Sequence, residues 1–351
     1  MLNIAYVGFG KSTNRYHIPY VRQRPDKFHI GRVVAPHINK RPNDRLALEK
    51  TGTVFSTDIQ DIIADKTVDL VIVVTPAPTH FTVVRQLLMA GKNVLVDKPV
   101  VATAQEATEL IALANKNGLF FMPFQNRRFD SDFLTLKHVL NTGYVGRPIE
   151  LELHMDHYRP NDAKLTGSAM ETTWFDHGAH LVDQIVSLFG APQAVAYDLR
   201  ATRDLSATLS DQFEANLFYD DAFKATIQSS ETTVTHYPKW ILHGTKGSYV
   251  KHNIDQQEYD LKAGIMPGDV GFGQDAPQDY GKVTYYNQNN DRLEKFVPSI
   301  LGDYGSVYDS VFETIVNKRP KLVSDEQLLT TMQILEAGIA DVNPHIVNFN
   351  H

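Results

Sequence analysis

The chain has 351 residues, of which 42% are hydrophobic, so it is long enough for two domains that each bury a core. Its formal charge of −7 argues against nucleic acid or an anionic membrane as the main partner, because both attract concentrated positive charge. The lack of cysteine excludes disulfides, thiolate zinc sites, iron–sulfur clusters and a cysteine nucleophile. A strand is predicted from residue 2 and no apolar run of about 18 residues occurs, so we expect a cytoplasmic location.

The chain opens with an apolar strand that runs into a glycine-rich turn. Residues 2–7 form the strand, and a G-x-G sequence follows directly, before a helix predicted to reach residue 21. In a dinucleotide-binding turn the first glycine permits the bend, the second lets the backbone approach the pyrophosphate, and the helix N-terminus supplies N–H groups. A lone G-x-G also occurs in ordinary turns, so this one gains weight only from its context. The cofactor contacts predicted here are Gly8, Phe9, Gly10, Lys11, Ser12 and Thr13.

The end of the second strand, predicted at residues 28–34, bears on the choice of cofactor. NAD-binding domains place a carboxylate near this strand end, about 20 residues after the glycines, where it binds the ribose hydroxyls. The sequence has no carboxylate there, and His37, Lys40 and Arg41 instead provide donors and positive charge. These groups suit the 2′-phosphate of NADP, although a solvated loop is the alternative interpretation. We therefore expect NADP in preference to NAD.

Strands and helices alternate through the first 125 residues. The run at 68–76 is apolar without alternation, which is typical of a central parallel strand covered on both faces. Thr79 is predicted to cap a helix that reaches residue 90, and Thr103 to cap another that reaches residue 117. The pattern predicts a doubly wound parallel sheet in a domain of residues 1–124. Further strands of this sheet are expected at 93–96 and 119–124.

The pattern changes beyond residue 125. Short strand-like segments follow, and they predict one large, mainly antiparallel sheet in an α+β domain of residues 125–351. Residues 264–288 contain five glycines and are predicted to form a long loop. Closing helices are expected at 304–317 and 324–341. The predicted strands cover residues 149–159, 194–202, 212–219, 224–231, 239–243 and 248–253.

Two stretches carry the residues best suited to chemistry. Lys98 follows an apolar strand, at the end where open parallel sheets present their ligand crevice. Asp176 and His180 are four residues apart, so one helix would place a carboxylate and an imidazole on the same face. An imidazole with an unperturbed pKa near ~6.5 suits a general base, and a lysine ammonium favours negative charge on a substrate oxygen. A structural hydrogen bond and a surface lysine are the alternative interpretations.

These motifs, in this order and spacing, resemble the Gfo/Idh/MocA family of NAD(P)-dependent oxidoreductases over the whole chain. The residues that carry the resemblance are Gly8-Phe9-Gly10, Thr75-Pro76 with His80, Asp97-Lys98-Pro99, and the run from Asp176 through His180 to Asp183. Residues 125–130 and 252–258 are similar to the subgroup that contains NADP-dependent scyllo-inositol dehydrogenase. The family usually has glutamate where Asp97 stands, which keeps the charge and shortens the reach. Thr13 likewise replaces a smaller residue.

The resemblance implies hydride transfer between NADP(H), or NAD(H), and a secondary alcohol or ketone of an inositol, sugar or related polyol. It also implies a Rossmann domain followed by a sheet domain, and a homodimer or homotetramer formed through the open face of the second domain's sheet. The catalytic residues would be Lys98, Asp176 and His180. The further cofactor contacts would be His37, Thr75, Pro76, His80, Asp97, Lys98, Pro99 and Gln125. The predicted substrate contacts are Tyr16, Arg127, Tyr158, Trp174, Asp176 and His180.

Two other functions stay open at this point. One is a catalytically silent regulator that senses NAD(P), against which the presence of Lys98, Asp176 and His180 argues. The other is a glycosidase of the same fold that uses bound NAD for a transient oxidation. Metal ligation is conceivable at residues 176, 177 and 180, or at 154, 156 and 157. We expect no metal, because hydride transfer requires none.

Overall fold

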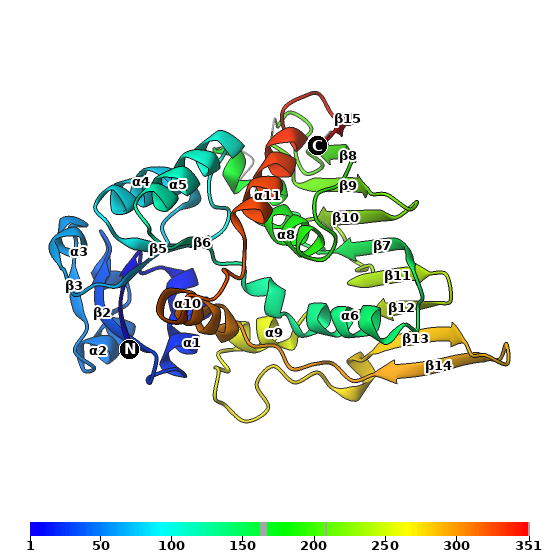
Figure 1. Cartoon of the computed structure of the whole chain (residues 1–351), viewed down its shortest axis with the longest axis horizontal. Helices are drawn as coiled ribbons and strands as arrows, with labels where there is room; N and C mark the ends of the chain where they lie inside the picture. The colour runs from blue at the N-terminus through cyan, green and yellow to red at the C-terminus, as the bar shows by residue number, and fades with distance from the viewer. Residues whose placement is uncertain (162–166, 208, 350–351) are drawn as a thin grey trace. The chain divides into compact units, whose positions relative to one another are not determined.

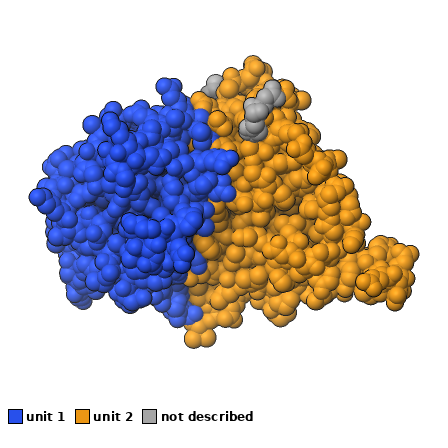
Figure 2. Space-filling view, viewed as in Figure 1, with its two compact units in different colours: residues 1–126, 266–269, 304–329 blue, residues 127–265, 270–303, 330–351 orange. Residues whose placement is uncertain are grey.

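The computed structural model describes residues 1–161, 167–207 and 209–349 of the chain. The chain divides into two compact units (Figure 2). Unit 1 comprises residues 1–126, 266–269 and 304–329, and unit 2 comprises residues 127–265, 270–303 and 330–351. The sequence-based boundary after residue 124 assigned residues 304–329 to the second domain, whereas in the structure they are part of unit 1.

Unit 1 is built on a six-stranded parallel sheet with the order β3-β2-β1-β4-β5-β6 (Figure 1). Its strands are β1 Leu2–Val7, β2 Phe28–Val34, β3 Val54–Ser56, β4 Leu70–Val73, β5 Asn93–Val96 and β6 Phe121–Pro123. All four residues of β4 are buried, as expected for a strand that is paired on both sides and covered on both faces. The strand order changes direction between β1 and β4, which is where such sheets bind their ligands. The predicted Rossmann sheet is confirmed.

The helices of unit 1 follow the predicted alternation, and one of the two predicted caps is present. Thr103 caps its helix as predicted, since its hydroxyl accepts the N–H of Glu106 at 3.1 Å. Thr79 does not cap: its hydroxyl lies 2.7 Å from the carbonyl of Pro76 instead, and that prediction was wrong. The helices are η1 Thr13–His17 (a π-helix), α1 Ile18–Arg22, η2 Ile38–Lys40, α2 Pro42–Glu49, α3 Gln60–Ala64, η3 Ala77–Thr79, α4 His80–Met89, α5 Ala104–Lys116 and α10 Gly305–Asn317.

Unit 2 is built on a nine-stranded sheet with the order β14-β13-β12-β11-β7-β10-β9-β8-β15, seen stacked in Figure 1. Only the pair of β7 with β10 is parallel, so the prediction of a mainly antiparallel sheet is confirmed. The strands are β7 Pro148–His154, β8 Ala194–Arg200, β9 Gln212–Phe218, β10 Lys224–Ser230, β11 Trp240–Gly244, β12 Gly247–Lys251, β13 Gly281–Tyr286, β14 Arg292–Val297 and β15 His345–Asn348.

Three strands of this sheet were not predicted. Residues 281–286 form β13 inside the segment that the sequence predicted to be loop, so that prediction was wrong over these residues. In β14, five of six residues are exposed, and β15 contains no buried residue. Both are edge strands with one neighbour, so their sequences lack the apolar pattern on which strand prediction depends.

The helices of unit 2 include one that is buried nearly all round. Residues 178–186 of α8 are all buried, and the helix packs on β10. Its charged and amide residues, Asp183 and Gln184, are buried together with its apolar ones. The helices are η4 Asn126–Phe129, α6 Ser131–Thr142, η5 Ala169–Glu171, α7 Thr173–Asp176, α8 Gly178–Phe189, α9 Gln256–Ala263 and η6 Pro277–Asp279; α11 Asp325–Gly338 begins in unit 1 and ends in unit 2.

Candidate active site

The glycine turn between β1 and η1 has two glycines with different roles. Gly8 has a φ of +113°, and a Cβ there would lie 2.2 Å from the carbonyl oxygen of Val74. Gly10 has neither constraint, since a Cβ on it would meet no atom within 4 Å. The protein itself therefore requires glycine at position 8 but not at position 10. Open space at the second glycine fits a turn in which a dinucleotide pyrophosphate approaches the backbone.

Because of this difference, alanine substitutions at the two glycines are expected to affect two different quantities. Gly8→Ala is expected to lower the free energy of unfolding by at least about 2 kcal/mol, because it adds backbone strain and a steric clash. Gly10→Ala is expected to leave that free energy unchanged and to weaken NADPH binding by about tenfold or more, because its methyl group enters the space left for the pyrophosphate. Urea unfolding and fluorescence titration of NADPH measure the two quantities. Full NADPH affinity in Gly10→Ala would show that this turn does not bind the cofactor.

Thr13, at the position of the third small residue, is fully buried. Its hydroxyl donates to the carbonyl of Gly8 at 3.1 Å, which ties the first turn of the helix to the bend. The helix begins with π-helical geometry over Thr13–His17. The threonine thus stabilises the turn by a hydrogen bond that a glycine or alanine could not make.

Asp97 connects the glycine turn to Lys98. Its Oδ2 accepts a hydrogen bond from the hydroxyl of Ser12 at 2.7 Å and lies 3.7 Å from Nε2 of His17. Its Oδ1 accepts the main-chain N–H of Lys98 at 2.9 Å. Burial by itself would raise the pKa of Asp97, but the interaction with His17, the hydrogen bond from Ser12 and the charge of Lys98 lower that pKa to about 2. The carboxylate therefore holds the backbone of Lys98 against the glycine turn, although it is shorter than the usual glutamate.

The depressed pKa of Asp97 predicts a pH-dependent contribution to stability. A carboxyl group whose folded pKa lies below its ordinary value stabilises the fold above about pH 4, and this contribution is lost as the pH falls toward 2. Asp97→Asn is expected to lower the free energy of unfolding by about 2 kcal/mol at pH 6. The difference from wild type should shrink between pH 4 and pH 2. A difference that stays constant over this interval, measured by urea unfolding, would contradict the assignment.

His80, at the start of α4, is a predicted cofactor contact that the structure finds buried. Its Nδ1 lies 2.8 Å from the carbonyl of Pro99, and its Nε2 lies 2.9 Å from the carbonyl of Thr75. The ring joins the loop after β4 to the loop after β5, where the Lys98–Pro99 peptide bond is cis. Its side chain therefore positions these loops, and any effect on the cofactor acts through them.

The other predicted cofactor residues of unit 1 differ in exposure. Phe9 is buried and packs edge-on against Phe55, so only its backbone belongs to the turn's surface. Gln125 is buried after β6. The residues that the structure leaves exposed or half-exposed are Lys11, His37, Thr75 and Pro76. Tyr16, a predicted substrate contact in η1, is also half-exposed.

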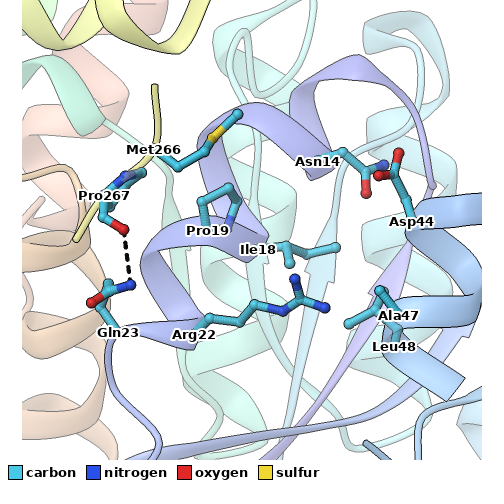
Figure 3. A pocket seen from close by; sticks show the side chains of 10 residues that line it. All are labelled: Asn14, Ile18, Pro19, Arg22, Gln23, Asp44, Ala47, Leu48, Met266 and Pro267. Carbon is cyan, nitrogen blue, oxygen red and sulfur yellow. Dashed lines mark hydrogen bonds between the residues drawn. The ribbon is translucent and has the colours of Figure 1, made fainter. Parts of the chain in front are cut away.

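A pocket beside the glycine turn was not predicted (Figure 3). One of its lining residues, Asn14, donates from Nδ2 to the carbonyl of Gly10 at 2.9 Å. In Figure 3 the side chains of Asn14 and Asp44 point toward each other across the pocket, and Arg22 extends toward Leu48. The full lining is Asn14, Ile18, Pro19, Arg22, Gln23, Asp44, Ala47, Leu48, Met266 and Pro267. These residues are separate from the predicted cofactor contacts.

In unit 2 the predicted Asp176/His180 helix is broken into α7 and α8 at His177. Helical hydrogen bonding resumes at once, because the N–H groups of His180 and Leu181 both point to the carbonyl of His177, at 3.0 and 3.1 Å. A Cβ on Gly178 would lie 3.0 Å from the Trp174 ring, so a larger residue here would require that ring to shift by a few tenths of an ångström. The Asp176 side chain is exposed, whereas His180 is buried at 6% exposure.

Trp174 does not fit its predicted role in substrate binding. It is fully buried in unit 2, its indole N–H donates to the carbonyl of Leu335 at 2.8 Å, and its ring packs edge-on against Phe213. Trp174 is a core residue that fixes α7. Tyr158 is exposed, and the guanidinium of Arg127 lies 3.2 Å from Asp130 and 3.4 Å from Glu258.

The buried pair of Arg128 and Asp183 is a further element of this region that sequence reasoning missed. The guanidinium donates to both carboxylate oxygens, at 2.8 and 2.7 Å, and both side chains are nearly inaccessible. Gln184 of the same helix donates to the carbonyl of Arg127 at 2.8 Å. These bonds fix α8 to η4, so they orient the helix that carries His180. The available signal was a further carboxylate, Asp183, on the same face of the predicted helix as Asp176 and His180.

Comparison with known proteins identifies the family of both units. Residues 2–125 match the model described as "Oxidoreductase family, NAD-binding Rossmann fold", and residues 137–345 match "Oxidoreductase family, C-terminal alpha/beta domain". The chain belongs to the Gfo/Idh/MocA oxidoreductase family. As a member of it, the chain is an oxidoreductase with a nicotinamide-cofactor domain.

Relatives of this Gfo/Idh/MocA chain extend over its full length. The uncharacterized oxidoreductase YhhX of Escherichia coli is 42% identical over 99% of both chains. The scyllo-inositol 2-dehydrogenase (NADP(+)) IolW of Bacillus subtilis is 29% identical over 96% of this chain and 93% of its own. A solved structure of an oxidoreductase from Bacillus cereus has a TM-score of 0.95 and 40% identity, covering 100% of this chain and 99% of that one.

Proposed function

We propose that this oxidoreductase transfers a hydride between NADP(H) and a secondary alcohol or ketone of an inositol, sugar or related polyol. The observation that carries the proposal is that Asp97 accepts hydrogen bonds from both Ser12 and the backbone of Lys98. These bonds tie Lys98 to the glycine turn within unit 1. The relative named as an NADP-dependent scyllo-inositol dehydrogenase supports the substrate class.

In the proposed reaction His180 and Lys98 act on the substrate hydroxyl, and Asp176 acts through His180. His180 takes the hydroxyl proton as general base and returns it in the reverse direction. Asp176 orients the imidazole and stabilises its charged form. Lys98 donates to the substrate oxygen and stabilises its developing negative charge. The nicotinamide supplies the carbon that accepts or gives up the hydride.

The test is a screen for NADP+ reduction over inositol isomers and aldoses, run with NAD+ in parallel. Reduction with at least one inositol or aldose supports the proposal. NADPH binding without turnover over the whole panel, and over the matching ketoses with NADPH, would instead support a regulator. Hydrolysis of glycosides without net cofactor reduction would support the glycosidase.

Preference for NADP is proposed to depend on the loop that follows β2. His37 and Lys40 are exposed there, while Arg41 has Nη1 3.3 Å from Asp44. The double variant Lys40→Ala/Arg41→Ala is expected to lower kcat/KM for NADP+ by about 10- to 100-fold, the value of losing charge-assisted hydrogen bonds. Values for NAD+ should change little. Lys50→Ala, which removes an exposed charge just after α2, is the control. Equal losses for NADP+ and NAD+ would contradict a 2′-phosphate contact.

Oligomerisation through the open face of the nine-stranded sheet stays a prediction, which light scattering of the purified chain can measure. Cytoplasmic location stays a prediction as well. None of the helices within the described residues combines the length and the hydropathy needed to cross a membrane.

A further inference from the structure

Unit 2 brings together three side chains that the sequence did not connect. His157 follows β7, His177 lies between α7 and α8, and Glu231 follows β10. One ligand atom from each lies within 4.8 Å of the other two. The parallel pairing of β7 with β10 places His157 beside Glu231, and the N–H of His157 donates to the carbonyl of Ser230 at 2.8 Å.

The distances within this group suit ligands around an ion better than direct hydrogen bonds. Oε1 of Glu231 is 4.0 Å from Nδ1 of His157 and 3.8 Å from Nε2 of His177. Both separations exceed a hydrogen bond. Neighbouring ligands around a tetrahedral zinc ion with bonds of about 2.0–2.1 Å lie about 3.3 Å apart. Small side-chain rotations would close the difference.

The hydrogen bonds of the His177 ring determine which of its two nitrogens carries the proton. The hydroxyl of Ser229 donates to the carbonyl of Met155 at 2.5 Å, so it accepts from Nδ1 of His177, which lies 2.8 Å away. With the proton on Nδ1, the neutral ring presents unprotonated Nε2 toward Glu231. A second hydrogen bond that fixes the tautomer in this way is the usual support for a metal-binding histidine.

The charges around the group are divided between the two oxygens of Glu231. Arg159 approaches Oε2, with Nη1 3.7 Å away, whereas both imidazoles face Oε1. Asp176 adds a second carboxylate, whose Oδ2 is 3.8 Å from Nε2 of His177, and its side chain is 54% exposed. Solvent therefore has access to the group on the side of Asp176.

We propose that His157, His177 and Glu231 bind a divalent transition-metal ion of the zinc class. Two imidazoles and one carboxylate bind such ions with coordination positions left open, which Asp176 or water can fill. The two metal sites considered from the sequence, at residues 176, 177 and 180 and at residues 154, 156 and 157, each contained one of these two histidines. Neither contained Glu231, because strand pairing rather than sequence spacing places it beside the histidines.

The test is equilibrium dialysis of the EDTA-treated full chain against zinc sulfate, with cobalt(II) absorption as a second readout. Wild type is expected to bind one zinc per chain, with the d–d spectrum of a low-coordinate cobalt site. His157→Gln and Glu231→Gln are each expected to weaken zinc binding by about 100-fold or more, since they remove a direct ligand. The matched control is His252→Gln, which removes an exposed histidine outside the group and should bind like wild type.

The Arg159→Gln variant separates the proposal from a folding defect, because a misfolded chain would bind zinc more weakly and not more tightly. It removes the cation paired with Oε2 of Glu231, so zinc should bind more tightly than to wild type. Wild type that binds no more zinc than the His157→Gln variant would overturn the proposal. So would a cobalt spectrum that is the same in all variants.

Discussion

Lys98→Met is expected to lower kcat by about 10²- to 10³-fold, the loss seen when one preorganised donor to a developing oxyanion is removed. Methionine keeps the length of the side chain and removes the ammonium. The backbone N–H that Asp97 accepts is unchanged, so the turn should remain folded. Steady-state kinetics measure kcat, and fluorescence titration of NADPH separates a catalytic loss from a loss of cofactor binding.

Two further variants define the role of Lys98. Lys98→Arg retains the positive charge and should recover part of the lost rate if that role is electrostatic. Lys116→Met removes an exposed lysine at the end of α5 and should leave kcat unchanged. A wild-type kcat in Lys98→Met would remove this lysine from the mechanism.

His180→Asn is expected to lower kcat by about 10²- to 10⁴-fold, because a positioned general base contributes rate enhancement of that size. Asparagine is smaller than histidine and keeps a polar side chain, so the buried site at the start of α8 has room for it. The limb of the pH profile of kcat/KM that reports protonation of the base should disappear in the variant.

The control for this histidine is His29→Asn, which changes an exposed side chain of β2. Its rate and pH profile should match those of wild type. A His180→Asn enzyme that is slow but keeps the wild-type pH profile would show that the imidazole positions the site without moving the proton.

The sequence predicted the elements whose residues are buried on both sides or capped locally. β1, β2 and β5 have the predicted bounds, and Thr103 caps α5, because a run of apolar residues or a cap is encoded within a few neighbours. The edge strands β14 and β15 were missed, because an edge strand has one neighbour and little burial. The packing of a neighbour decides whether such a segment becomes a strand.

The same distinction applies to the candidate site. The sequence by itself determined the glycine turn, the lysine at the end of β5 and the Asp/His spacing, because each is a local pattern with its own chemistry. Only the tertiary structure decided that His80 joins two loops, that Trp174 lies in the core, and that His157 meets Glu231. These contacts join segments distant in the chain through strand pairing and side-chain packing, which residue spacing does not encode.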